Sequence, residues 1–135
     1  MSDFVDTNVF IRVLTKDDPL KFERCLSLLE RAERGEIRLI TSESVVAEII
    51  YVLSGPIYRT SRAVISELLR PILENRGLTL DHKQSIIEAL AVYGESNLDF
   101  EDCLSVAHTH RLGLGAIYSY DQHFDRVPTV RRSEP

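Results

Sequence analysis

The stretch FVDTNVFI, residues 4–11, places three polar residues inside an apolar run. Phe4-Val5 and residues 9–11 have the composition of a buried segment, whereas residues 6–8, Asp-Thr-Asn, interrupt it. An ionised carboxylate that is buried without a partner is costly, so it normally becomes neutral instead. The triplet is therefore either a turn or part of a binding site, and the rest of the sequence has to distinguish these two possibilities.

Length and composition are those of an ordinary globular domain. The chain has 135 residues, of which 44% are hydrophobic and 27% charged, so we expect a single domain over residues 1–135 with a real hydrophobic core. No apolar stretch approaches a membrane span, and Asp3 stands where a signal peptide would be basic. Cys25 and Cys103 are too few and too isolated for a disulfide framework. These features predict a cytoplasmic protein with no membrane association.

Bulk charge argues against a nucleic-acid partner. The formal net charge is −5 and the pI is about 5.4, whereas contacts to phosphates normally require lysine and arginine. A local arrangement of charge can override this average. The composition therefore disfavours nucleic-acid binding without excluding it.

Short apolar segments alternate with helical patterns along the chain. Such alternation implies parallel strand pairing and a layered α/β fold. We expect a central parallel sheet of four to five short strands flanked by helices. The predicted strands are residues 3–5, 37–40, 78–80, 115–121 and a short one near 129–131.

Capping residues mark where the helices should begin and end. Gly35 should stop the helix that starts at Asp18-Pro19, and Pro71 should kink or break a later helix. Asp81, with Gln84 three residues on, resembles a capping box. The predicted helix starts are near Thr7 or Asn8, at Asp18-Pro19, Ser42, Ser61, Asp81 and Asp99.

Two acids follow predicted strands directly. Asp6 ends the first strand and Asp121 ends the fourth, and ligand sites in open parallel sheets lie beyond the carboxyl ends of the strands. Each acid has a simpler explanation, because Asp6 can cap the following helix and Asp121 can form a turn. Their shared position nevertheless suggests a site.

Two further acids are candidates for the same site. Glu48 lies mid-helix in VVAEIIYVL and is either a site residue or part of an exposed polar face. Asp102 belongs to LDFEDCL, where three acids crowd one helix start. The helix dipole accounts for acids there, but three exceed what a cap requires. Asp125 is either a supporting acid or solvated.

Converging carboxylates would raise one another's pKa values. A hard divalent cation relieves that repulsion, and Mg²⁺ or Mn²⁺ prefers oxygen ligands. Such an ion can also bridge an acidic site to an anionic substrate. Asp6, Glu48, Asp102 and Asp121 are therefore predicted to form a metal site, while a general acid or base role for His123 is less favoured.

The segments FVDTNVFIRVL, SESVVAEIIYVL, LDFEDCLSVAHTHRLG and AIYSYDQHFDRV resemble, in order, the acidic motifs of PIN-domain nucleases. The resemblance is strongest to VapC-like toxins of prokaryotic toxin–antitoxin pairs. It covers residues 3–127, leaving a short C-terminal tail. Each motif alone is weak, but four in this order are specific.

The resemblance implies a Mg²⁺- or Mn²⁺-dependent endoribonuclease with a central parallel sheet. Its catalytic and metal-binding acids would be Asp6, Glu48, Asp102 and Asp121. Asn8 and Ser119 correspond to supporting polar residues beside the first and fourth acids. Relatives usually form homodimers, and the toxins bind a cognate antitoxin protein, so both partners are expected here alongside the RNA substrate.

Basic residues near these motifs are candidates for contact with RNA. Arg12 and Lys16 follow the first motif, and Arg59 and Arg62 lie in YRTSRAVISELLR. Arg70, Arg131 and Arg132 are further candidates. Ordinary solvated surface is the simpler explanation for any one of them.

Three other functions compete with the nuclease. A haloacid-dehalogenase-type phosphatase needs a second Asp where this chain has Asn8. A response-regulator receiver needs an early acid pair and a mid-chain Asp on a strand, and the predicted middle strands, residues 37–40 and 78–80, contain no acid. A non-catalytic PIN-like module that binds RNA or protein remains possible, although all four acids are present. No Ser-His-Asp spacing or phosphate-binding glycine loop occurs.

Overall fold

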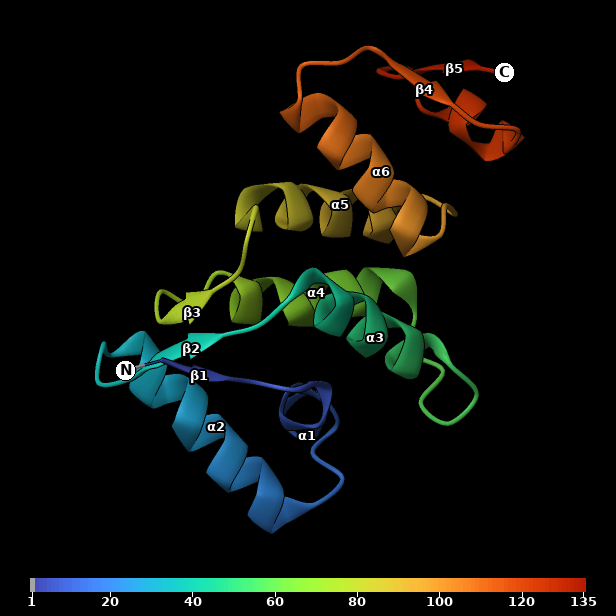
Figure 1. Ribbon diagram of the computed structural model, residues 1–135. Helices are drawn as coiled ribbons and strands as arrows, with labels where there is room; N and C mark the ends of the chain where they lie inside the picture. Colours follow the sequence, from blue (N-terminus) through green and yellow to red (C-terminus); the bar gives the residue numbers. More distant parts are fainter. Residues whose placement is uncertain (1) are drawn as a thin grey trace.

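The computed structural model describes residues 2–135 (Figure 1). Helices and strands alternate from β1 to β5, with a 3₁₀ helix, η1, near the end. The helices are α1 Thr7–Thr15, α2 Pro19–Glu33, α3 Glu43–Ser54, α4 Arg62–Leu73, α5 Lys83–Glu95 and α6 Phe100–Arg111. The strands are β1 Ser2–Phe4, β2 Arg38–Ile40, β3 Leu78–Thr79, β4 Ala116–Tyr118 and β5 Arg131–Ser133, and η1 is Gln122–Arg126.

Three of the six predicted helix starts are confirmed by side-chain capping. The carboxylate of Asp18 accepts a hydrogen bond from the Lys21 amide, and Pro19 occupies the first turn of α2. Ser42 and Ser61 cap α3 and α4 in the same way. Each hydroxyl or carboxylate satisfies an amide that the first helical turn leaves without a partner.

Three local predictions need correction. Asp81 does not cap α5, because His82 occupies the N-cap position in the left-handed conformation, with φ 55°. The Lys83 ammonium donates to the carbonyls of Asn75 and Leu78, and it fixes this turn instead. Asp99 is at the N-cap position of α6 but makes no capping bond within the described chain. Pro71 does not break α4, which continues to Leu73.

All strand pairs are parallel, and they form two sheets. One sheet has the order β1-β2-β3, and the other contains β4 and β5. The α/β class and the five short strands are therefore confirmed, whereas the single central sheet is divided. Within residues 2–135, β4 pairs with β5 and does not pair with β1, so the sheet is divided between β1 and β4.

The apolar core has two parts. The larger cluster packs α1–α6 against β1–β3 and includes buried Phe10, Ile49, Leu69 and Ile86. Figure 1 shows α1 and α2 on one side of this sheet and α3 and α4 on the other. A smaller cluster of Val106, Phe124 and Val130 attaches β4, η1 and β5 to the outer side of α6.

The described helices include none that is both long and apolar enough to cross a bilayer. Cys103 is buried in the larger cluster. Burial raises the pKa of its thiol to about 11. Cys103 is therefore a core residue and not a nucleophile at neutral pH.

Gly77 is required where the chain enters β3. A Cβ atom at this position would lie 2.1 Å from the backbone oxygen of Ala32 at the end of α2. Backbone cannot move aside as a flexible side chain can, so Gly77→Ala should lower the free energy of unfolding by about 2 kcal/mol or more. Urea denaturation followed by circular dichroism measures this loss.

Gly115→Ala is the matched control, because a Cβ at Gly115 would have no atom within 4 Å. Its free energy of unfolding should stay within about 0.5 kcal/mol of the wild type. Equal stability of the two variants would show that α2 and β3 are not in this close contact.

Candidate active site

Asp6 is exposed at the carboxyl end of β1 and occupies the N-cap position of α1. Its backbone is extended, but its side chain makes no capping bond within the described residues. The capping explanation for this acid therefore does not hold. The carboxylate is left available to a ligand at the strand end.

A hydrogen bond connects this strand end to α3. The buried Thr7 hydroxyl donates to Glu48 Oε2 at 2.8 Å. Because Thr7 directly follows Asp6, the bond holds the Glu48 carboxylate close to the start of α1. Glu48 is exposed, whereas aliphatic side chains on either side of it in α3 are buried. Asp6 and Glu48 form the first half of the candidate site.

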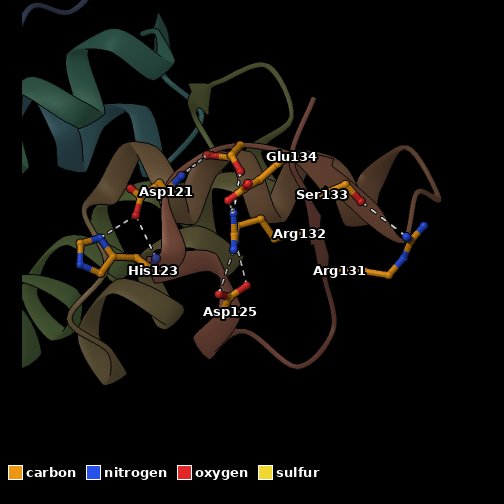
Figure 2. Close-up of polar contacts among 8 residues, drawn as sticks. Asp121, His123, Asp125, Arg131, Arg132, Ser133 and Glu134 are labelled. Atoms are coloured by element: carbon orange, nitrogen blue, oxygen red, sulfur yellow. Dashed lines mark hydrogen bonds and ion pairs between the residues drawn. The ribbon is translucent and has the colours of Figure 1, made fainter.

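Asp102, Asp121 and His123 form the second half. Asp102 lies in the first turn of α6, and Asp121 follows β4 and caps η1 by accepting a bond from the His123 amide at 2.9 Å. His123 Nδ1 is also 2.9 Å from Asp121 Oδ1 (Figure 2). The three side chains offer ligand atoms that all lie within 4.8 Å of one another.

The charges in this half repel one another. Burial raises the pKa of Asp102, and the nearby charges of Asp121 and Asp99 raise it further. A cation bound between Asp102 and Asp121 would reverse this penalty by favouring both ionised carboxylates. Two carboxylate oxygens and an imidazole nitrogen are also a ligand set that divalent metals accept. The donors present therefore fit a divalent ion.

The two halves are separate within one chain. Among residues 2–135, Asp6 and Glu48 lie outside the group formed by Asp102, Asp121 and His123. Asp102 and Asp121 are the pair of predicted acids that the structure brings together. His123, which the sequence disfavoured, adjoins that pair because η1 turns its ring back towards Asp121.

A guanidinium supports the Asp121 turn. Arg132 on β5 forms ion pairs with Asp125 at 2.9 Å and with Glu134 at 2.8 Å (Figure 2). It also donates to the backbone oxygen of Ser119 at 3.0 Å, and the Ser119 hydroxyl accepts a bond from the Asp121 amide at 3.0 Å. Ser119 and Asp125 thus stabilise the turn that contains Asp121.

Arg132 was a candidate for RNA contact, but its side chain is only 14% exposed and its guanidinium is occupied. Its positioning role depends on the pairing of β4 with β5, a long-range contact that sequence spacing does not reveal.

Asn8 is exposed in the first turn of α1 and lines a hollow that also includes Arg12 and Lys21.

The four basic candidates Arg12, Lys16, Arg59 and Arg62 differ in the contacts that they already make within the protein. Arg12 pairs with Asp17 at 3.1 Å, and Arg62 donates to the Leu98 carbonyl at 2.5 Å. Arg62 also lies over the Tyr93 ring, with 4.4 Å between guanidinium carbon and ring centroid. Lys16 and Arg59 are exposed, and each has a positive φ at the end of a turn or helix. Their role in binding RNA stays a prediction.

The fold and the acidic strand ends define an α/β protein of the PIN class. The PIN domain model matches residues 4–130, and the chain belongs to this family. The chain is also similar to the VapC ribonuclease of Aquifex aeolicus (strain VF5), with 25% identity over 123 residues. That alignment covers 91% of this chain and 90% of the relative.

Asp102→Asn should stabilise the metal-free protein at neutral pH. The folded protein raises the pKa of Asp102 above its ordinary 3.8, so protonated Asp102 stabilises the fold at lower pH. This contribution is lost as the pH rises through the raised pKa. The variant should therefore lose less stability than the wild type as the pH rises to neutral, and urea unfolding at several pH values measures the difference.

Glu101→Gln is the matched control, since it removes an exposed charge from the adjacent position. It should shift stability less than Asp102→Asn. If both variants gave the same pH profile, the effect would come from overall charge and not from the acidic cluster.

Proposed function

We propose that this protein is a Mg²⁺- or Mn²⁺-dependent endoribonuclease and the toxin of a toxin–antitoxin pair. Membership of the PIN family and similarity to a VapC ribonuclease support the reaction class. The observation that carries the proposal is the grouping of Asp102, Asp121 and His123 within 4.8 Å at the end of a parallel strand. A bound cation would make this concentration of negative charge favourable.

In the proposed site, all four predicted acids would contribute metal ligands. Asp102 and Asp121 would provide carboxylate oxygens from α6 and the β4 end, while Asp6 and Glu48 would provide them from the β1 end and α3. A bound Mg²⁺ or Mn²⁺ would stabilise charge on the phosphodiester oxygens and lower the pKa of an attacking water. The Thr7 hydroxyl orients Glu48, and the Ser119–Arg132 contacts orient Asp121.

Proton transfer is assigned to the residues around Asp121. His123 is bonded to Asp121 through Nδ1, and its side chain is 55% exposed. This arrangement fixes one ring nitrogen and allows the ring to exchange a proton with a reacting oxygen or with solvent. His123 is therefore a candidate general acid for the leaving oxygen of the cleaved phosphodiester.

Binding of RNA to a chain of net charge −5 requires local compensation. The metal itself would attract the scissile phosphate, and Arg12, Lys16, Arg59 and Arg62 are the proposed contacts for flanking phosphates. A toxin of this kind would act in the cytoplasm and would be held inactive by a cognate antitoxin protein.

Cleavage of a mixed RNA panel in Mg²⁺, Mn²⁺ or EDTA tests this function. Wild-type protein should cleave only with a divalent ion. Asp6→Asn or Asp121→Asn should reduce the rate by about 100-fold or more, because each removes charge that stabilises the metal. Circular dichroism should show that both variants remain folded.

Glu101→Gln serves again as the control, and it should keep cleavage close to the wild-type rate. Wild-type cleavage by both Asp6→Asn and Asp121→Asn would overturn the site assignment. Folded wild-type protein that leaves the whole panel intact would favour a non-catalytic PIN module that binds RNA or protein.

A further inference from the structure

Within residues 2–135 the two sheets have four edge strands, β1 and β3 in one and β4 and β5 in the other, and β1 and β4 are the two that lead into the candidate site. Within residues 2–135, β1 pairs on one side with β2, and β4 pairs on one side with β5. Parallel sheets normally have both faces covered, yet every residue of β1 is exposed. Phe4, the last residue of β1, is 60% exposed, and Tyr118, the last residue of β4, is 76% exposed. Both edges therefore lack a neighbour.

The chain holds its own β4 away from its own β1. Helix α6 packs on α5 through buried Phe100, Cys103 and Leu104. His108 Nε2 is 2.6 Å from Glu43 of α3, and His110 Nδ1 is 2.8 Å from Glu88 of α5. These contacts fix α6, and β4 follows it after a short turn.

The β4–β5 sheet is fixed in turn to the outer side of α6. Val106 of α6 packs with Phe124 and Val130, and His110 Nε2 is 2.9 Å from the Thr129 hydroxyl. Figure 1 shows β4 and β5 at one end of the molecule, with α5 and α6 between them and β1. A single chain in this conformation cannot join its β1 edge to its β4 edge.

The β1 and β4 edges also carry complementary halves of the candidate site. Asp6 and Glu48 lie at the β1 end, whereas Asp102, Asp121 and His123 lie at the β4 end. When two strands pair in parallel, their carboxyl ends meet at one edge of the sheet. Parallel pairing of β1 with β4 would therefore bring Asp6 beside Asp121.

We propose that two copies of this chain exchange their open edges, so that β4 of each copy pairs in parallel with β1 of the other. The product is a two-fold dimer with two sheets of the order β3-β2-β1-β4-β5, in which β4 and β5 come from the second copy. Each sheet has one complete acidic site, made of Asp6 and Glu48 from one chain and Asp102 and Asp121 from the other. The composite site rests on the proposed function, whereas the strand exchange does not.

A second copy fits these edges better than an unrelated strand does. One reciprocal contact pairs the edges of β1 and β4 in both copies at once, so a closed two-fold arrangement leaves neither of these two edges to propagate. The exposed Phe4 and Tyr118 would be covered by the same contact. Backbone pairing along an exposed edge is also a common mode of protein association.

Cysteine cross-linking tests the exchange without any activity. In a Cys25→Ser background, Phe4→Cys chains are mixed with Tyr118→Cys chains and treated with a short bis-maleimide. The expected product is a covalent dimer that contains one chain of each kind. Leu20→Cys on exposed α2 replaces Phe4→Cys in the control mixture, which should give little dimer.

The double variant Phe4→Cys, Tyr118→Cys distinguishes exchange from closure within one chain. Exchange predicts cross-linked dimers whose yield falls on dilution below the dissociation constant. Cross-linking that stays within single chains at every concentration would overturn the proposal, and so would a mixture that gives no more dimer than the Leu20 control.

Mixing of inactive variants tests the composite site. Asp6→Asn and Asp121→Asn chains are refolded together, so that half of the dimers contain one chain of each kind. Each such dimer has one site with all four acids and one site that lacks two of them. The mixture should therefore regain about a quarter of wild-type cleavage, although each variant alone is inactive.

The outcomes separate this proposal from the proposed function. Dimer-specific cross-links between the cysteine variants, together with a wild-type protein that cleaves no RNA, would support exchange and overturn the nuclease. Metal-dependent cleavage by the wild type, with no regain in the mixture and with cross-links inside single chains, would support the nuclease and overturn exchange.

Discussion

The position of helix α6 is the constraint on which the site depends. Its buried residues pack on α5, and His108 and His110 tie its outer part to Glu43 and Glu88. Asp102 lies in the first turn of this helix, and the β4–β5 sheet that positions Asp121 packs on its outer side. The packing of α6 therefore decides which acids meet and which remain apart.

At the end of β4, charge repulsion destabilises the folded state, whereas hydrogen bonding stabilises it. Burial and the nearby charge of Asp121 raise the pKa of Asp102, so the ionised Asp102 carboxylate raises the free energy of the folded state. Arg132 and Ser119 nevertheless hold the Asp121 turn in place. A fold that keeps repelling carboxylates together in this way sacrifices stability for a site, and such sacrifices are typical of functional positions.

The division of the sheet connects the fold to the proposed assembly. Three-residue parallel strands with exposed side chains have little stability by themselves, because a parallel sheet depends on cover from both faces and on neighbouring strands. β1 and β4 each lack one such neighbour within the described chain. Strand pairing between copies would supply the neighbours and unite the half-sites by the same contact.

Local chemistry determined much of this protein from sequence alone. Asp18, Ser42 and Ser61 begin helices because their side chains bond to amides within three residues. The β1 and β4 segments are strands, and an acid follows each within three residues. Asp81 is not the cap of α5, because the helix begins at Lys83 and His82 occupies the N-cap position. Lys83 bonds there to the carbonyls of Asn75 and Leu78, contacts that a capping pattern does not reveal.

The sequence by itself determined the α/β class, the short parallel strands and the acids at their ends, since these follow from periodicity and from neighbours along the chain. Only the tertiary structure decided that Asp121 meets Asp102 and His123, that Arg132 supports their turn, and that β4 lies apart from β1. Those outcomes depend on how α6 packs against α5 and α3, which joins residues far apart in the sequence.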